Sequence, residues 1–473
     1  MVEKKIFRQY DIRGVVPDQF NPEILKIIGN TFGQNLKKKL NKVPVVSVGR
    51  DVRLSSNDLF KGLTAGLTDA GCDVINLGTT PTPVTYFSSF KLHTDAFMMI
   101  TGSHNPPEYN GLKFGIGKDT VHSEGITDLY NDIINGQYLI TDKRGNIKDY
   151  DIISDYIQFY EENFTELKQK IRTIKGVKVV IDAGNGAASL VAPKIFELLG
   201  VDVVKLYCEP DGRFPNHHPD PTVEENLDDA KEVVKIDKAD FAVAFDGDAD
   251  RIGVLDESGN IIWGDILLYI YARELKERYE KPKIIADVKS SKLLFDMLDN
   301  IGAEGIMWKT GHSLIKQKLK ETGAELAGEM SGHIFFKDRF FGFDDAIYAA
   351  VRFLEAYVEN KLEGKIEKCS DLTKDLPKVY NTPEIRFECD DNKKFKIVEQ
   401  LSEIFNEYLK NGKLGIKSII SIDGVRVNFD NGWGLIRASN TQPVLVMRFE
   451  AENIEAMNNY KKIFEAELSK IKI

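Results

Sequence analysis

The sequence has few cysteines and no long apolar run, and these absences exclude several classes of protein. Four cysteines are scattered over 473 residues, with no CxxC pair and no histidine at zinc-finger spacing: Cys72, Cys208, Cys369 and Cys389. A disulfide framework and a zinc finger are therefore excluded, and we expect a reducing, cytoplasmic location. No apolar run approaches the ~20 residues of a membrane-spanning helix, and the first residues contain no signal-peptide core. We therefore expect no membrane partner.

An excess of basic residues is also missing. The chain has 63 Lys and Arg against 73 Asp and Glu, a formal net charge of −10. A broad nucleic-acid surface needs a basic face that neutralises phosphates, so we expect no nucleic-acid partner. A small anionic substrate is compatible with this charge, because its pocket needs only a few Arg and Lys residues. No coiled-coil pattern demands a second subunit, so we expect a monomer and leave an oligomer open.

What the sequence does contain is a repeated order of apolar strand, polar loop and helix. Strand-like runs with polar ends lie at 43–51, 95–100, 177–186, 240–250, 283–291, 305–313 and 325–333. Near-continuous apolar strands alternating with helices predict parallel sheets, with ligands beyond the carboxyl ends of the strands. From about residue 381, successive strands with short turns instead predict an antiparallel α+β domain. The polar, poorly periodic stretch 361–380 between them is the predicted linker and hinge.

An acidic loop follows the strand-like run FAVAF (241–245). Asp246, Asp248 and Asp250 occupy alternate positions, and an extended backbone would project all three to one side. Such carboxylates repel one another unless a cation neutralises them, and Mg²⁺, Mn²⁺ and Ca²⁺ prefer such oxygen ligands. A solvated acidic turn is the alternative. The adjacent Arg251 would balance the aspartates or bind a phosphate.

Two other motifs compete for this loop. An EF-hand beginning at Asp246 has Glu257 at position 12, but Arg251 stands at position 6 where the turn needs glycine, so we reject it. A phosphatase that uses Asp246 of the D-x-D pattern as nucleophile remains the second mechanism.

Three further loops combine groups suited to sugars and phosphates. TGSHNPPEYNG (101–111) carries Ser103 and His104, which read locally as a nucleophile with its base, a phosphate carrier or a tight turn. GEMSGH (328–333) offers Glu329 and Ser331 to sugar hydroxyls. RASNTQP (437–443) favours phosphate binding. Further candidates, each typical of ordinary surface or core positions when taken alone, are Tyr10, Arg13, Lys113, Lys289, Lys309, His312 and His333.

Taken in order, TGSHNPPEYNG, DGDADR, GEMSGH and RASNTQP resemble the α-D-phosphohexomutase superfamily, and most closely its bifunctional phosphomannomutase/phosphoglucomutase branch. The likeness extends to FRQYDIRGVV (7–16), FPNHHPDP (214–221), WKTGHSLIK (308–316) and FFGFDDAIY (340–348). The resemblance implies an α/β protein of four domains around a central cleft. Three similar mixed α/β domains would cover 1–150, 151–258 and 259–368, and a TBP-like α+β domain would cover 369–473.

The resemblance also implies a reaction and roles in it. Mg²⁺, held by Ser103, Asp246, Asp248 and Asp250, would assist a phosphoserine on Ser103. The phosphoryl group would move between O1 and O6 of small-molecule hexose phosphates through a hexose 1,6-bisphosphate, which also acts as activator. Glu329 and Ser331 would bind sugar hydroxyls. The phosphate that does not react would be bound by Tyr10, Lys289, Arg437, Ser439, Asn440 and Thr441. Charge stabilisers or proton carriers would be Arg13, His104, Lys113, Arg251, His312 and His333, with the general acid/base left open.

Two positions bear on the branch of the family. Ala249 stands where the family often has a second glycine, which leaves the backbone path of the acidic loop in question. Met330 favours mannose and glucose phosphates over glucosamine phosphate, where relatives tend to have Gln. Phosphoglucosamine mutase therefore remains an alternative, beside the phosphatase and a non-catalytic sugar-phosphate sensor.

Overall fold

The computed structural model describes residues 2–174, 176–391, 393–440 and 442–471. The chain forms two compact units. Unit 1 contains Met1–Tyr271 and Ser331–Leu372, and unit 2 contains Ala272–Met330 and Thr373–Ile473. The chain thus passes between the units at three places, and the predicted linker 361–380 contains the last of them.

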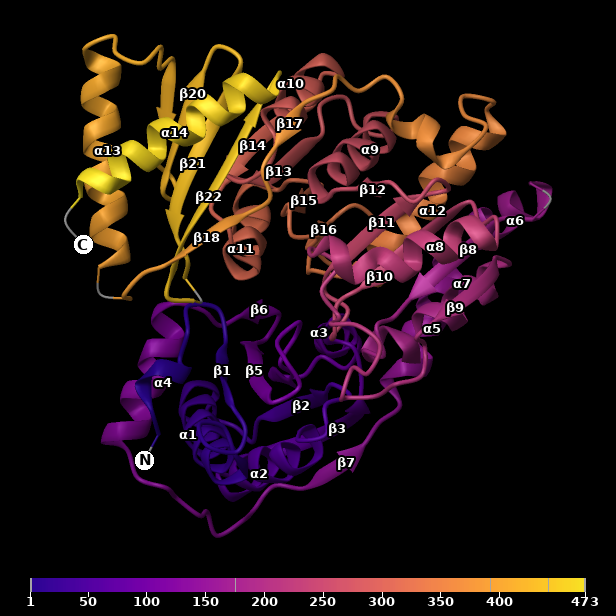
Figure 1. Cartoon of the computed structure of the whole chain (residues 1–473). Helices are drawn as coiled ribbons and strands as arrows, with labels where there is room; N and C mark the ends of the chain where they lie inside the picture. Colours follow the sequence, from indigo (N-terminus) through magenta and orange to yellow (C-terminus); the bar gives the residue numbers. More distant parts are fainter. Residues whose placement is uncertain (1, 175, 392, 441, 472–473) are drawn as a thin grey trace. The chain divides into compact units, whose positions relative to one another are not determined.

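Unit 1 begins with a seven-stranded sheet of order β1-β5-β4-β2-β3-β7, to which β6 adds beside β5 (Figure 1). Strands β4, β2, β3 and β7 run parallel, whereas β5 is antiparallel to β1, β4 and β6. The strands are β1 (Ile12–Val15), β2 (Val45–Arg50), β3 (Asp73–Thr79), β4 (Ala96–Ile100), β5 (Tyr109–Ile116), β6 (Asp119–Thr120) and β7 (Ile147–Asp149).

Helices cover both faces of this sheet. Met98 of β4 lies in one core with α1, α2 and α4, whereas the ring of its neighbour Phe97 contacts Tyr86 of α3. Because successive strand residues point to opposite faces, α3 covers the second face. The helices are η1 (Lys4–Ile6), α1 (Pro22–Leu40), α2 (Ser56–Asp69), α3 (Thr82–Lys91) and α4 (Glu124–Asn135).

A second sheet of unit 1 has the order β12-β11-β10-β8-β9, with β10, β8 and β9 parallel and β11 and β12 antiparallel. Its strands are β8 (Lys178–Asp182), β9 (Asp202–Leu206), β10 (Phe241–Phe245), β11 (Ile252–Asp256) and β12 (Ile261–Ile262). The helices of this part are α5 (Ile152–Asn163), α6 (Thr165–Thr173), η2 (Ala187–Leu190), α7 (Ala192–Leu199), η3 (Glu224–Leu227), α8 (Asp228–Ile236) and α9 (Gly264–Lys276), which runs on into unit 2. The chain returns to unit 1 for β16 (Ile334–Phe336), α12 (Ala346–Leu362) and most of η4 (Cys369–Thr373).

Unit 2 contains three parallel strands, β13 (Lys283–Asp287), β14 (Glu304–Trp308) and β15 (Leu326–Gly328), with α10 (Lys292–Asn300) and α11 (His312–Thr322). Its C-terminal part is an antiparallel sheet of order β17-β22-β21-β20-β19, with β18 beside β22. The elements are β17 (Tyr380–Asn381), β18 (Ile385–Glu388), α13 (Lys394–Lys410), β19 (Ser418–Ile420), β20 (Val425–Phe429), β21 (Gly432–Ala438), β22 (Val444–Ala451) and α14 (Ile454–Lys470). Both helices share one apolar core with this sheet.

The structure confirms the mixed α/β sheets and the antiparallel C-terminal α+β part. The purely parallel sheets expected from the apolar rhythm are wrong, because β5 and β11 return antiparallel directly after the loops that follow β4 and β10. All four cysteines are free thiols. Among the described residues, no helix combines the length and apolarity that a membrane crossing requires.

Candidate active site

In unit 1, Ser103 lies directly against the acidic loop. It follows β4, the acidic loop follows β10, and the Ser103 hydroxyl donates to Asp246 Oδ2 at 2.9 Å. Both side chains are buried. Ser103 has a φ of 49°, in the left-handed region, and its N–H donates to Thr101 Oγ1 at 2.8 Å. This hydrogen bond joins the loop of Ser103 to the acidic loop of Asp246, although the two residues are 143 positions apart in the chain.

The backbone of the acidic loop is a tight turn, and the extended path expected from the sequence is wrong. Asp246 Oδ1 accepts hydrogen bonds from the N–H groups of Asp250 at 3.0 Å and Arg251 at 3.2 Å, which closes the turn. Ala249 has a φ of 62°, a left-handed conformation that explains why glycine suits this position. The carboxylates nevertheless gather, because the turn folds Asp250 back onto Asp246.

The three aspartates form a cluster that fits a divalent cation. Each of Asp246, Asp248 and Asp250 offers one carboxylate oxygen within 4.8 Å of the others, and all three are fully buried. Asp248 Oδ1 and Asp250 Oδ1 have no hydrogen-bond partner among the residues that the structure describes. Buried carboxylate oxygens that accept no hydrogen bond are the donors that Mg²⁺ prefers in proteins.

Lys113 of β5 supplies a positive charge to this cluster. Its Nζ lies 2.9 Å from Asp248 Oδ2 and also forms an ion pair with Asp250 Oδ2. Burial lowers the pKa of Lys113, but Asp248 and Asp250 outweigh it and raise this pKa well above its ordinary value. Burial with repulsion from Asp250 and Asp248 raises the pKa of Asp246 well above its usual range. Burial opposes the charge of Asp248, but Lys113 and Thr82 lower its pKa overall.

His104 contacts Ser103 through a ring nitrogen. Its Nδ1 lies 3.1 Å from Ser103 Oγ. The single hydroxyl proton of Ser103 points to Asp246, so an ionised Asp246 leaves His104 Nδ1 as the donor to Oγ. Burial, followed by Arg251 and Arg13, lowers the pKa of His104 well below its ordinary value, so this imidazole is neutral near pH 7.

Arg13 and Tyr10 lie at the start of β1. Arg13 donates to Asn105 Oδ1 at 2.8 Å and to Asp11 Oδ2 at 2.5 Å, which places its guanidinium beside the Ser103 loop. Tyr10 precedes the strand and is buried.

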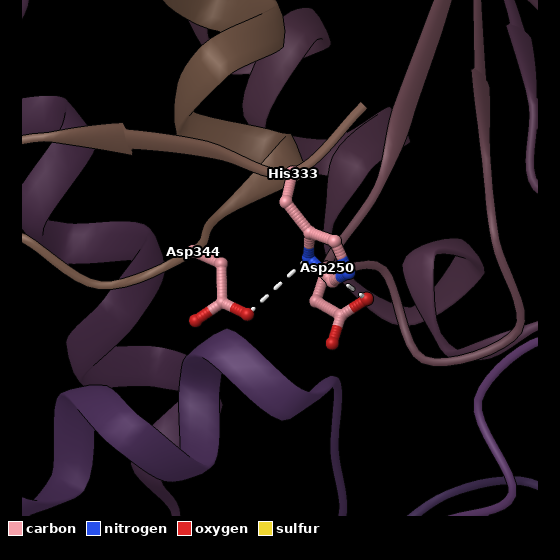
Figure 2. A group of neighbouring side chains, drawn as sticks. All are labelled: Asp250, His333 and Asp344. Carbon is pink, nitrogen blue, oxygen red and sulfur yellow. Dashed lines mark ion pairs between the residues drawn. The ribbon is translucent and has the colours of Figure 1, made fainter. Parts of the chain in front are cut away.

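Arg251 and His333 form a second polar group next to the aspartates. Arg251 Nε donates to His333 Nε2 at 3.0 Å, and His333 Nδ1 lies 3.3 Å from Asp344 Oδ2 and 3.6 Å from Asp250 Oδ1 (Figure 2). Because an arginine N–H only donates, Nε2 must be the acceptor and Nδ1 must carry the proton. The cluster Asp250, His333 and Asp344 has metal-ligand composition. A protonated Nδ1 does not bind a metal, and in this tautomer Nδ1 faces the two carboxylates.

Ser331 begins the segment that carries His333. The next residue, Gly332, has a φ of 89°, and its carbonyl accepts the N–H of Ile252 at 3.0 Å. A Cβ at Gly332 would lie 2.4 Å from the carbonyl oxygen of Ile252. The second glycine of GEMSGH therefore fixes His333 beside the strand that follows the acidic loop.

In unit 2, Lys289 follows β13 and is paired with carboxylates. Its Nζ lies 2.8 Å from Glu384 Oε1 and 3.6 Å from Asp287 Oδ2, and the lysine is buried. Burial lowers the pKa of Lys289, but Glu384 and Asp287 raise it overall. Lys289, with burial opposing, holds the pKa of Glu384 well below its usual range. Lys289 is therefore a cation at any pH near neutrality.

Arg437, at the end of β21, lies beside the segment that contains His312. Arg437 Nη2 is 3.0 Å from Asp423 Oδ2, and the same oxygen accepts the N–H of Thr310 at 3.0 Å. Glu329 Oε1 accepts the N–H of Gly311 at 2.5 Å. The 310–311 segment thereby connects the GEMSGH and RASN loops.

The remaining predicted residues of unit 2 occupy the same loops. His312 is buried at the first turn of α11. Ser439 Oγ accepts the N–H of Gln442 at 3.2 Å, which shapes the loop in which Asn440 also lies. Thr441 lies outside the described residues. Lys309 follows β14 directly.

Several residues that the sequence reading did not select as site candidates support this site. Thr82 donates its hydroxyl to Asp248 Oδ2 at 2.5 Å and its N–H to the Asp248 carbonyl. Asp344 orients His333, while Asp423 and Glu384 pair with the cations of unit 2. Asp344 lies within the FFGFDDAIY motif, and Asp423 precedes a glycine at a strand end, which were the available signals.

Comparisons with known proteins match this chain along most of its length. The four phosphoglucomutase/phosphomannomutase models, for alpha/beta/alpha domains I, II and III and the C-terminal domain, match residues 4–136, 154–259, 263–380 and 384–467. A phosphomannomutase/phosphoglucomutase of Pseudomonas aeruginosa is 43% identical over 98% of this chain and 96% of its own length. A phosphoglucomutase of Neisseria gonorrhoeae is 40% identical over 98% and 97%. A Burkholderia thailandensis structure of the phosphoglucomutase/phosphomannomutase family has a TM-score of 0.87 and 37% identity, covering 99% of this chain and 98% of that one.

Proposed function

The chain belongs to the α-D-phosphohexomutase superfamily, and from this we propose that it is a phosphomannomutase/phosphoglucomutase, which interconverts hexose 1-phosphates and hexose 6-phosphates. The contact that carries the proposal is the 2.9 Å hydrogen bond between Ser103 Oγ and Asp246 within the buried aspartate cluster. It places a phosphorylatable hydroxyl beside three carboxylates suited to Mg²⁺. The domain boundaries at 150, 258 and 368 stay predictions.

Ser103 is the phosphoryl carrier in this proposal. The phosphoserine P–O bond to Ser103 breaks as the hexose 1-phosphate O6 bonds to phosphorus, which gives a hexose 1,6-bisphosphate and free Ser103. After the sugar turns around, Ser103 Oγ takes the phosphoryl group from O1 and hexose 6-phosphate leaves. Each hydroxyl proton is exchanged with a group of the site, and the net reaction is an isomerisation. Bound bisphosphate would also rephosphorylate an inactive Ser103.

The residues around Ser103 divide between charge and proton handling. Asp246, Asp248, Asp250 and the phosphoserine would hold Mg²⁺, which would supply charge neutralisation at the transferring phosphoryl group. Lys113 stays a cation, because Asp248 and Asp250 raise its pKa, so we assign it to charge stabilisation rather than base catalysis. Arg13 and Arg251 add further positive charge. His104 and His333 are then the imidazoles able to exchange a proton.

Unit 2 supplies the recognition groups of the proposal. Lys289 and Arg437, with Tyr10 from unit 1 and the hydroxyl and amide groups of Ser439, Asn440 and Thr441, would bind the phosphate that does not react. Glu329 and Ser331 would bind sugar hydroxyls in both orientations of the sugar. His312 would lie close to the substrate. Closure of a central cleft would exclude water and keep the phosphoserine from hydrolysis.

A phosphatase with Asp246 as nucleophile is the weaker alternative. Both carboxylate oxygens of Asp246 are engaged, Oδ1 by two backbone N–H groups and Oδ2 by Ser103. A carboxylate that attacks phosphorus needs a free oxygen facing the substrate. The four free cysteines fit the expected reducing cytoplasm, which remains a prediction, as does the monomeric state.

A coupled assay tests the proposal. Purified protein with Mg²⁺ is given glucose 1-phosphate, mannose 1-phosphate or glucosamine 1-phosphate, each with and without glucose 1,6-bisphosphate. We expect the first two to be isomerised, bisphosphate to activate, and peptide mapping to find phosphate on Ser103. Ser103→Ala should lose about 10³-fold or more of kcat.

Other outcomes identify the alternatives. Inorganic phosphate as main product, with phosphate on Asp246 and a fully active Ser103→Ala variant, would replace the mutase by a phosphatase. A preference for glucosamine 1-phosphate would move the chain to the phosphoglucosamine branch. Binding without turnover would mean a sensor.

A further inference from the structure

Arg53, in the segment after β2, is a buried arginine whose guanidinium is completely used. It is 2% exposed. Nη1 donates to the carbonyls of Pro106 at 2.6 Å and Tyr109 at 3.0 Å. Nη2 donates to the carbonyls of Ser103 at 2.7 Å and Asn105 at 2.5 Å. Nε donates to Asp51 Oδ2 at 3.2 Å, so all five N–H donors of the guanidinium have acceptors.

Asp51 ties this arginine to the start of the same loop. Its Oδ1 accepts from the backbone N–H of Arg53 at 3.0 Å and from Ser56 Oγ at 2.6 Å. Its Oδ2 also accepts the N–H of Gly102 at 3.2 Å. Asp51 therefore binds the N–H of Gly102, directly before Ser103, and Arg53 binds the carbonyl of Ser103 and three carbonyls after it.

The close packing around Arg53 is supported by two further segments. A Cβ at Gly102 would lie 2.6 Å from the Arg53 guanidinium carbon, so only glycine leaves room for the side chain here. On another side, the Arg53 guanidinium lies over the ring of Phe214 at 5.1 Å. Phe214 opens FPNHHPDP, a motif that the proposed chemistry left without a role. Phe214 contributes a cation–π contact that helps to hold the Arg53 guanidinium in place.

Arg53 holds the loop at Ser103, a residue whose backbone conformation is strained. Ser103 has a φ of 49°, a left-handed conformation that is unfavourable for a residue other than glycine. Its N–H is fixed by Thr101 Oγ1 and its carbonyl by Arg53 Nη2. Without Arg53, four carbonyls would lose their hydrogen bonds to the guanidinium, and the loop would relax toward an unstrained path. Ser103 Oγ would then leave its position against Asp246.

We propose that Arg53 is the positioning residue of the phosphorylatable Ser103, holding its loop by four carbonyl oxygens rather than binding phosphate itself. This inference rests on the proposed mutase function for its kinetic consequence. Since no N–H of Arg53 is left for a ligand, the substrate phosphate gains nothing from it. Loss of Arg53 therefore lowers kcat and leaves KM unchanged, the opposite of what removal of a phosphate-binding arginine does.

The kinetic test uses full-length protein with Arg53→Lys and Arg53→Ala. A lysine keeps the charge beside Asp51 but cannot reach four carbonyls with a planar fork. We expect kcat to fall about 100-fold in both variants, because a misplacement of about 1 Å costs that much, with KM for glucose 1-phosphate within about 2-fold. Methylguanidinium, below unfolding concentrations, should restore at least 10-fold of kcat in Arg53→Ala and none in Arg53→Lys.

Arg50→Ala is the matched control. Arg50 lies three residues earlier, and its donors go to Asn57 and Asn76, away from the Ser103 loop. It should keep the wild-type kcat and show no response to methylguanidinium. If Arg53→Ala does not fold, Arg53→Lys carries the kcat and KM comparison alone.

Hydrogen–deuterium exchange separates this inference from the proposed function. In the Arg53 variants, amides of residues 102–110 should exchange at least 10-fold faster than in wild type, while β2 and β4 keep their protection. Unchanged exchange there, an unchanged kcat, or a raised KM at constant kcat would each overturn the inference. If wild-type protein isomerises no hexose phosphate, the proposed function fails, and the exchange measurement still decides the role of Arg53.

Discussion

The charged groups of unit 1 and unit 2 are balanced in opposite ways. Around Ser103, three buried aspartates face one lysine, Lys113, and two of their oxygens accept no hydrogen bond from the described residues. In unit 2, each key cation already has its own carboxylate, Glu384 for Lys289 and Asp423 for Arg437. In the first region, three buried carboxylates share one lysine. In the second region, each positive charge is paired with a carboxylate that a bound phosphate would replace.

We infer from this difference that the region around Ser103 is suited to the chemical step and that the cations of unit 2 are suited to reversible phosphate binding. A cluster of buried carboxylates is suited to hold a metal ion, which in the proposed function would neutralise charge at the transferring phosphoryl group. Cations paired with carboxylates bind a phosphate by exchanging one anion for another, so binding stays weak enough to reverse. A mutase needs reversible phosphate binding, because its bisphosphate intermediate must be released, turn around and be bound again.

The largest expected effect comes from a change in the carboxylate cluster around Ser103. Asp246→Asn keeps the hydrogen bonds of the turn but removes a negative charge, so kcat should fall by about 10³-fold, the scale of several kcal/mol of lost charge stabilisation. The metal-free variant should nevertheless melt higher than metal-free wild type, by about 1–1.5 °C for each kcal/mol of relieved repulsion in a protein of this size.

The pH dependence of that stability follows from the pKa of Asp246. Its folded pKa is raised, so ionisation costs stability, and metal-free wild type should become less stable as pH rises through that raised pKa. Asp246→Asn should lack this decline. Calorimetry with EDTA and with Mg²⁺ measures both, and a variant less stable than wild type at pH 8 without metal would contradict the idea of unrelieved repulsion.

Arg437→Ala tests the second half. Loss of one charge-assisted phosphate contact, about 1.5–3 kcal/mol, should raise KM for glucose 1-phosphate and mannose 1-phosphate alike by about 10–100-fold. The kcat should change by less than about 5-fold, because the proposed function assigns Arg437 to the phosphate that does not react. Steady-state kinetics on both sugars measure this. An effect on one hexose alone would assign Arg437 to the sugar instead.

Glu384→Gln sharpens the idea of exchangeable partners. Removing the carboxylate leaves Lys289 without the partner that a phosphate must displace, so KM should fall by about 2–5-fold, the scale of one partly exposed ion pair. Glu388→Gln, at the exposed end of β18, the strand that begins one residue after Glu384, is the matched control and should leave KM unchanged. A raised KM in Glu384→Gln would mean that Glu384 orients Lys289 and does not compete with the ligand.

Ala249→Gly gives the smallest effect. Glycine relieves the left-handed strain at a φ of 62° but adds backbone entropy to the unfolded chain, so the net gain should lie between about 0 and 1 kcal/mol. The kcat should stay within about 2-fold, since a glycine keeps the N–H that Ala249 donates to the Asp246 carbonyl at 3.1 Å, and the side chain of Asp246 bonds other residues of the turn. Chemical denaturation measures the gain, and a loss of stability would show that packing of the Ala249 methyl outweighs strain.

The sequence predicted the elements well where apolar strands end in polar motifs. The strand-like runs at 43–51 and 95–100 contain β2 and β4. Asp246, Asp248 and Asp250 come together as expected, although through a turn rather than an extended strand. Their proximity follows from sequence neighbours on one short loop, which is information that the chain carries locally.

Other parts of the site carry no local signal. Arg53 holds backbone carbonyls, and every residue has a carbonyl, so no pattern of side chains reveals the pairing. Glu384 and Asp423 are ordinary acidic residues until the fold places them beside Lys289 and Arg437. The tautomer of His333 depends on Arg251, 82 residues away. Long-range partners of this kind become visible only in three dimensions.

The alternation of the chain between the two units sets an order of synthesis. Unit 1 lacks His333 and Asp344 until the first part of unit 2 has left the ribosome, since Ala272–Met330 precedes them. The acidic loop therefore emerges well before the histidine and carboxylate that complete its surroundings. It follows that no single cut in the gene yields either unit whole, because the three crossings divide the chain into four segments, and a split version that separates the two units would need four fragments.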